Sequence, residues 1–289
     1  MNSQQFKQWC QRMVPYPVTP DYLHQPLIMA ILNVTPDSFS DGGRFLDASH
    51  AFQHAMSMIA QGADVIDIGG ESSRPGADPI SIDEELTRVI PVIEQIRAES
   101  DVCISIDTYK AEVMQEAVNA GASLINDIMA LRSINALTTA ASLKVPVCLM
   151  HMQGMPKSMQ NAPIYQEGII EEINDFFQQR VEACLNAGIA REHILLDPGF
   201  GFGKSVRHNM RLVKQLTDFR KHQQPLLLGV SRKSTIGAVL NKPVAKRLTG
   251  SIAVAVFAAL QGISIIRTHD VEETKQALVM LDTIQTACR

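Results

Sequence analysis

The sequence predicts an α/β protein: a single-domain (β/α)8 TIM barrel with a short N-terminal extension. Eight short apolar runs, rich in residues that favour strands, alternate along the chain with segments of helical periodicity. Several of these helical segments end in a glycine shortly before the next apolar run, which is a common signal for a helix C-terminus. The length of 289 residues also suits a fold that typically takes about 250 residues.

The predicted strands are apolar through their N-terminal halves, which is typical of parallel strands buried on both faces. We expect them at Leu27–Val34, Val65–Gly69, Cys103–Asp107, Leu124–Ile128, Pro146–His151, Ile194–Asp197, Pro225–Val230 and Ile265–His269.

An amphipathic segment follows each predicted strand. The segment after the fourth strand, Ile134–Leu143, has the weakest pattern. An open, doubly wound sheet is the alternative fold, but it usually has fewer units and carries a glycine-rich turn after its first strand. The other predicted helices are Ala48–Gln61, Glu84–Glu99, Ala111–Ala120, Glu171–Asn186, Val206–Arg220, Ala245–Gln261 and Val271–Thr286.

Composition limits the class of protein and its partners. Residues 1–24 are a polar N-terminal extension without the apolar core of a signal peptide, and residues 25–289 make up the barrel domain. No apolar run approaches the roughly 20 residues needed to cross a bilayer. Five cysteines without a C-x-x-C pair indicate reduced thiols, so we expect a cytoplasmic protein. The net charge of -4, without a Lys/Arg-rich run, argues against a nucleic-acid partner.

Every predicted strand ends in polar or charged residues. Each such residue alone could cap a helix or face solvent, but eight together indicate a site at the C-terminal end of the barrel. The strand ends carry, in order, Asn33, Glu71 to Arg74, Asp107, Asn126 with Asp127, His151, Asp197, Ser231 to Ser234, and Arg267 with His269.

The strand-end residues fall into two chemical groups. Asp107, Asn126 and Asp197 offer acceptors that suit a flat heterocycle with several N–H donors. Arg267 and His269, beside the N-terminus of the last helix, suit a phosphate-bearing group. Asn33 could add an oxygen ligand to a hydrated Mg²⁺ that also binds substrate phosphates.

Two glycine-containing segments need separate interpretation. The run from Asp197 to Lys204 lacks the G-x-G-x-x-G spacing of a dinucleotide loop, so we interpret it as a turn that exposes Phe200 and Phe202. The segment from Pro36 to Gly43, around Phe39, is lid-like, and a disordered loop is an equal alternative.

The strand-end motifs together resemble the dihydropteroate synthase family, which has a pterin-binding TIM barrel. The resemblance runs from about Leu27 to the end of the chain, in family order, and its first two motifs are the most specific. The motifs are Ile31–Gly43, Gly69–Ala77, Ser105–Lys110, Ile125–Ile128, Met150–Gly154, Asp197–Lys204, Ser231–Ser234 and Arg267–Val271.

The resemblance implies a reaction and a role for each matching residue. The family joins 6-hydroxymethyl-7,8-dihydropterin diphosphate to 4-aminobenzoate, releases diphosphate, requires Mg²⁺ and is the target of sulfonamides. The implied pterin residues are Asp107, Asn126, Asp197, Lys233 and Arg267. The implied diphosphate residues are Asn33, Arg267 and His269, with Asn33 also the metal ligand. The implied catalytic residues are Lys233, Arg267 and His269. The implied 4-aminobenzoate residues are Phe39, Ser73, Arg74, Pro75, Phe202 and Ser234.

Ser73 departs from the family pattern, which usually has threonine there, so a hydroxyl is kept and a methyl contact is lost. Three alternatives stay open: a pterin-binding methyltransferase domain, an aldolase that uses Lys233 as a Schiff base, and a pterin-binding paralogue without turnover. The helical segments Ser251–Leu260 and Ala277–Ala287 are more apolar than one core-facing stripe requires. Together with the resemblance, they predict a homodimer.

Overall fold

The computed structural model describes residues 1–16, 25–35, 44–72, 76–154, 159 and 163–287. Its eight parallel strands lie in the order β6-β5-β4-β3-β2-β1-β8-β7. A parallel bridge between Leu196 and Leu226 brings β6 to β7, so the sheet closes into a barrel. The predicted (β/α)8 fold is confirmed. The strands are β1 (Leu27–Asn33), β2 (Val65–Gly69), β3 (Cys103–Asp107), β4 (Leu124–Asp127), β5 (Val147–Met150), β6 (Ile194–Asp197), β7 (Leu227–Gly229) and β8 (Ile265–Thr268).

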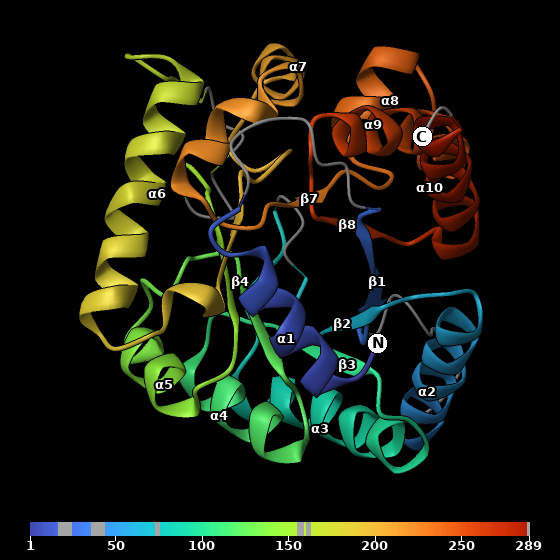
Figure 1. Cartoon of the computed structure of the whole chain (residues 1–289). Helices are drawn as coiled ribbons and strands as arrows, with labels where there is room; N and C mark the ends of the chain where they lie inside the picture. The colour runs from blue at the N-terminus through green and yellow to red at the C-terminus, as the bar shows by residue number, and fades with distance from the viewer. Residues whose placement is uncertain (17–24, 36–43, 73–75, 155–158, 160–162, 288–289) are drawn as a thin grey trace.

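Apart from α1 (Ser3–Met13), the helices form a ring around these strands (Figure 1). The α-helices are α1 (Ser3–Met13), α2 (Arg44–Ala60), α3 (Ile82–Glu99), α4 (Ala111–Ala120), α5 (Ala136–Leu143), α6 (Ile169–Asn186), α7 (Val206–Lys214), α8 (Ser234–Leu240), α9 (Leu248–Leu260) and α10 (Val271–Thr286). In the part of the chain that the structure describes, three 3-10 turns accompany them: η2 (Arg191–His193), η3 (Leu216–His222) and η4 (Val244–Lys246). None of the helices in these described ranges is long and apolar enough to span a membrane.

Two predicted helices were wrong in extent. The segment Val206–Arg220 is not one helix, because α7 ends before Gln215 and the tighter turn η3 follows. Leu216 and Phe219 of this turn are fully buried in the core. The segment that we expected from residue 245 becomes α-helical only at Leu248, since η4 comes directly after Pro243. The short helix α8 was not predicted.

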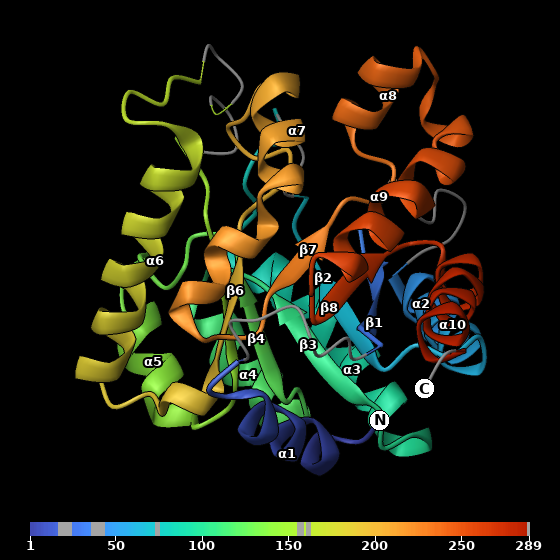
Figure 2. The ribbon, with the colours of Figure 1, turned by 45° about the horizontal axis from the view of Figure 1, so that its top comes forward.

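The N-terminal extension is not merely polar. Asn2 and Gln5 form a capping box that starts α1, and the apolar side of this helix is buried through Phe6, Trp9, Cys10 and Met13. These side chains pack against the bottom layer of the barrel interior, and α1 lies beneath the strands in Figure 2. Every strand supplies one residue to this layer: Met29, Val65, Cys103, Leu124, Cys148, Leu195, Leu227 and Ile265.

Strand register positions the site at the opposite end of the barrel. Asp107 lies beside Asn126 on neighbouring strands, and Asp197 lies beside Met150. On the other side, Asn33 lies beside Gly69, and Arg267 lies beside Gly229. With the lower interior filled by apolar side chains, the polar strand ends therefore meet above a closed base.

Candidate active site

Arg267 is the central cation of the site. It projects from β8 into the barrel, where its Nε donates to Asp67 Oδ2 at 2.6 Å and its Nη2 donates to Asp107 Oδ2 at 2.7 Å. One guanidinium thus joins carboxylates from β2 and β3. Because bonds between ionised groups are the stronger class of hydrogen bond, this pairing fixes the planes of all three side chains.

Asp67 is fully buried and lies one layer below the strand ends. Its Oδ2 also accepts a 3.1 Å hydrogen bond from the Nδ2 of Asn126 on β4. With its Nδ2 held in this way, the amide of Asn126 is fixed in orientation. A ligand that meets Asp107, Asn126 and Arg267 would therefore meet a rigid polar surface.

Burial and charge oppose each other in this cluster. Burial raises the pKa of Asp107 to about 7, although Arg267 lowers it, and the nearby Asp67 raises it further. Burial alone would lower the pKa of Arg267, but Asp67 and Asp107 outweigh it and leave that pKa above its usual value. The cluster holds two carboxyl groups for one guanidinium, so it favours a ligand that donates N–H groups or develops positive charge.

A second pair of charged groups lies across the barrel mouth. Burial raises the pKa of Asp197, while Lys233, its foremost charged neighbour, lowers it. Burial lowers the pKa of Lys233 to about 8. The Nζ of Lys233 donates to the carbonyl of Phe200 and lies 4.5 Å from the ring centroid of Phe202. The turn after β6 therefore supplies Phe202 as an aromatic wall beside this lysine, whereas Phe200, which we expected to be exposed as well, is fully buried.

The turn itself is held by Asp197 and by a buried lysine. Asp197 Oδ1 accepts a 2.7 Å bond from the Gly199 N–H, which leaves Oδ2 for other donors. Lys204, which is 2% exposed, donates to the carbonyl of Phe202 at 3.0 Å and lies 3.0 Å from His151 Nδ1. Burial lowers the pKa of Lys204 far below its usual value.

The predicted anion-binding end lies at the start of α10. Ser231 Oγ accepts from the backbone N–H of His269 at 3.2 Å and lies 3.0 Å from His269 Nδ1. Asp270, directly before α10, accepts a hydrogen bond from Arg232. The helix N-terminus favours negative charge at this place.

Comparison with known proteins identifies the family. Residues 29–269 match the model of the pterin binding enzymes. The chain is 52% identical to the dihydropteroate synthase of Escherichia coli (strain K12) over 265 residues, which cover 92% of this chain and 94% of that protein. The chain belongs to the dihydropteroate synthase family.

Solved structures of the family have the same fold. The Yersinia pestis dihydropteroate synthase in a sulfonamide drug complex has a TM-score of 0.87 and 51% identity, covering 92% of this chain and 96% of that one. The Xanthomonas albilineans dihydropteroate synthase in complex with 7,8-dihydropteroate has a TM-score of 0.82 and 41% identity, covering 93% and 95%.

Most of the site residues that we expected from the sequence lie at the barrel mouth. Asp107, Asn126 and Arg267 form one connected group, while Asp197, Lys233 and Phe202 gather at the ends of β6 and β7. Asn33 is partly buried at the end of β1, and Ser234 is exposed as the first residue of α8. Phe39, Ser73, Arg74 and Pro75 lie outside the described residues.

Asp67 and Lys204 were missed as site residues. Asp67 occupies the middle of the otherwise apolar strand Val65–Gly69, and a lone carboxylate in a buried strand is itself a signal for a charged partner. Lys204 is the last residue of the glycine-containing run, and our interpretation of that run considered only its glycines and phenylalanines. Asp127, beside Asn126, has a structural role, since its carboxylate accepts from the N–H groups of Met129 and Leu131.

The depressed pKa of Lys233 gives a testable pH dependence of stability. As the pH rises from about 8 towards the ordinary lysine value of 10.5, the folded chain releases this proton before the unfolded chain does. The unfolded state then binds more protons, so this group makes stability rise with pH in that window. The gain in free energy of unfolding from Lys233→Met, relative to the unchanged chain, should therefore be largest below pH 8. This gain should be lost by about pH 10.5.

Urea unfolding across this pH range measures the difference. The exposed lysine variant Lys242→Met is the control and should show no such trend. A difference between Lys233→Met and the unchanged chain that stays constant from pH 7 to pH 10.5 would contradict the lowered pKa.

Proposed function

We propose that this chain is a transferase that joins 6-hydroxymethyl-7,8-dihydropterin diphosphate to 4-aminobenzoate, giving 7,8-dihydropteroate and diphosphate for folate biosynthesis. The observation that carries the proposal is the pairing of Arg267 with two buried carboxylates at the barrel mouth, which also holds Asn126, Asp197 and Lys233. A related synthase that binds 7,8-dihydropteroate supports the same product here.

The pterin ring fits the acceptor groups of the site. Asp107, Asn126 and Asp197 offer oxygens from β3, β4 and β6, and a pterin carries ring N–H and amino donors around its edge. Arg267 supplies a planar guanidinium held in place by carboxylates, which is the geometry that packs against flat rings. Lys233 would donate to an acceptor on the pterin.

The diphosphate would lie at the start of α10, where Arg267, His269 and the helix N-terminus favour an anion. Mg²⁺ fits this place through Asn33, a neutral oxygen ligand, because Mg²⁺ keeps several waters and takes its other ligands from phosphate oxygens. Within the described residues no cluster of three or more His, Cys, Asp or Glu side chains could hold a metal ion, which agrees with such a sparse site. When bound, Mg²⁺ supplies positive charge to the leaving diphosphate.

The protein acts by positioning and by electrostatics. Loss of diphosphate from the pterin methylene places negative charge on the leaving oxygen, which Arg267 and His269 would stabilise. Positive charge develops on the pterin, next to Asp107 and Asp197. The aromatic amine of 4-aminobenzoate is unprotonated near neutral pH and can attack without a strong general base. Holding the two substrates in line supplies the rest of the acceleration.

The second substrate would lie beside Phe202, Lys233 and Ser234. The Lys233 ammonium above the Phe202 ring gives this pocket a cationic and an aromatic side, which suits a benzoate. Phe39, Ser73, Arg74 and Pro75 would complete it, as the family resemblance implies. A sulfonamide has the same flat aromatic amine, so we expect sulfonamides to compete there, and the Yersinia pestis complex supports this.

Diphosphate release tests the proposal directly. Purified protein should release diphosphate only when the pterin diphosphate, 4-aminobenzoate and Mg²⁺ are all present. Chelation of Mg²⁺ should stop release, and added Mg²⁺ should restore it. A folded protein that releases no diphosphate with all three would exclude the proposed reaction.

Asp197→Asn tests how the pterin is recognised. The amide oxygen would keep the bond to the Gly199 N–H, so the new NH2 would face a donor on the substrate. A hydrogen bond to a charged group is worth roughly 1.5–3 kcal/mol, and an unpaired buried donor costs more, so kcat/KM should fall by about 100-fold or more. The melting temperature should barely change. Full turnover with a lowered melting temperature would give Asp197 a purely structural role.

A homodimer is proposed from the exposed apolar surface of α9 and α10. Phe257, Val279, Met280 and Ile284 are each more than a third exposed on these neighbouring helices. Monomers rarely expose large contiguous apolar patches, and the contact between α9 and α10 can bring these side chains into one patch. Sedimentation at micromolar concentration should show a species of twice the chain mass of 31.8 kDa, whereas a 31.8 kDa species would contradict the dimer.

A cytoplasmic location is proposed from the thiols. Cys10, Cys103, Cys148 and Cys184 are buried and unpaired by disulfides, as expected in a reducing compartment. Cell fractionation that recovers the protein outside the cytoplasm would contradict this proposal.

A further inference from the structure

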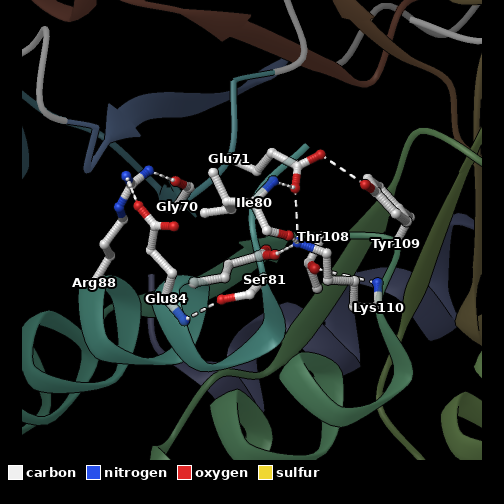
Figure 3. A network of polar contacts seen from close by, with 10 residues as sticks. Gly70, Glu71, Ile80, Ser81, Glu84, Arg88, Thr108, Tyr109 and Lys110 are labelled. Atoms are coloured by element: carbon white, nitrogen blue, oxygen red, sulfur yellow. Dashed lines mark hydrogen bonds and ion pairs between the residues drawn. The ribbon is translucent and has the colours of Figure 1, made fainter. Parts of the chain in front are cut away.

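A buried network of charged groups lies beside the site, at the base of the connection between β2 and α3 (Figure 3). Lys110 is its central cation. The Nζ of Lys110 donates to Glu71 Oε2 at 2.7 Å, to Glu85 Oε2 at 2.6 Å and to the Ile80 carbonyl at 2.8 Å. An ammonium group has three donors, and all three are used here.

Glu71 is held from three sides. Its Oε2 accepts from Lys110 and also from the backbone N–H of Ile80 at 3.1 Å, and its Oε1 accepts from the Tyr109 hydroxyl at 2.7 Å. Glu71 follows β2 and Ile80 lies just before α3, so this carboxylate ties the first part of the connection to its last part. Arg88 adds a 2.7 Å bond to the carbonyl of Gly70. Both ends of residues 71–80 are therefore fixed.

The network is charged and almost completely buried. The side chains of Lys110 and Glu71 are 12% and 13% exposed, and that of Glu85 is 1% exposed. Burial lowers the pKa of Lys110, but its bonds to Glu71 and Glu85 outweigh burial and leave the pKa above its usual value. Burial and the adjacent Glu71 raise the pKa of Tyr109, so its hydroxyl stays a donor. Loss of any one partner would leave a buried charge or donor unsatisfied.

Tyr109 connects this network to the aromatic wall of the site. Its hydroxyl bonds to Glu71, while its ring packs against an apolar cluster at the barrel mouth that also holds Phe202. The core of this cluster is Ile128, Met150, Met152 and Met159. Tyr109 and Lys110 also follow β3 directly after Asp107 and Thr108, so they are carried by the strand that supplies a pterin residue.

We propose that Glu71, Tyr109 and Lys110 are positioning residues for the second substrate, because Lys110 and Glu71 hold Tyr109, whose ring packs in the cluster that carries Phe202. None of the three touches the reacting atoms. The inference rests on the proposed use of Phe202 in the 4-aminobenzoate pocket. Displacement of Tyr109 should weaken 4-aminobenzoate binding and leave pterin diphosphate binding intact, because Asp107 keeps its own ion pair with Arg267.

Steady-state kinetics of Lys110→Met test this separation. The KM for 4-aminobenzoate should rise about tenfold, since a small misplacement of a binding group is costly, while the KM for pterin diphosphate should change less than about twofold. Tyr109→Phe keeps the ring in the cluster and removes only the hydroxyl, so the same KM should rise about threefold. If Lys110→Met fails to fold, Tyr109→Phe decides the question.

Arg97→Met is the matched control. Like Lys110, Arg97 is a partly buried cation, and it lies on α3. Its bonds to the carbonyls of Ser100 and Gly121 join α3 to α4 at the far end of the barrel. This variant should lose stability without changing either KM. The proposal is overturned if Lys110→Met and Tyr109→Phe lose stability with both KM values unchanged, or if both KM values rise together. If the protein without any substitution shows no activity, the proposed reaction is refuted instead.

Discussion

The site depends on one buried ion pair network. Arg267 enters the barrel from β8, and its guanidinium is the only group in the described part of the interior that bonds to both Asp67 and Asp107. Two carboxylates in a buried space cost several kcal/mol each unless they are paired. Arg267 offsets this cost, and in return Asp67 and Asp107 hold it in one orientation. Asn126 is then fixed through Asp67.

This arrangement separates the two halves of the reaction. The side proposed for the pterin and the leaving group is built on β3, β4, β6 and β8, whose positions are set by the closed barrel and its apolar base. The side proposed for the second substrate is built on connections, and these need their own fixation. Lys204 holds the turn that carries Phe202, while Glu71 and Lys110 hold the connection after β2. Buried lysines thus perform the same task in two places of the barrel mouth.

The sequence predicted much of the fold and the expected site, because strands of a parallel barrel are apolar and their C-terminal residues are polar. Asp67 was not predicted, since its partner Arg267 lies 200 residues away and only barrel closure brings β8 near β2. Nor was the division of α7 from η3, because both parts keep an apolar side. In α1, the spacing of Phe6, Trp9, Cys10 and Met13 did contain a helical signal among polar residues.

A double-mutant cycle on Asp67 and Arg267 tests the central claim most directly. Free energies of unfolding would be measured in urea for Asp67→Asn, Arg267→Met and the double variant. If the pair organises the site, each single change removes the charged hydrogen bond between Arg267 and Asp67, and the cycle should give a coupling energy of about 1.5–3 kcal/mol. Single effects that add to within about 0.5 kcal/mol of the double variant would show that the two side chains are independent, and would contradict the account.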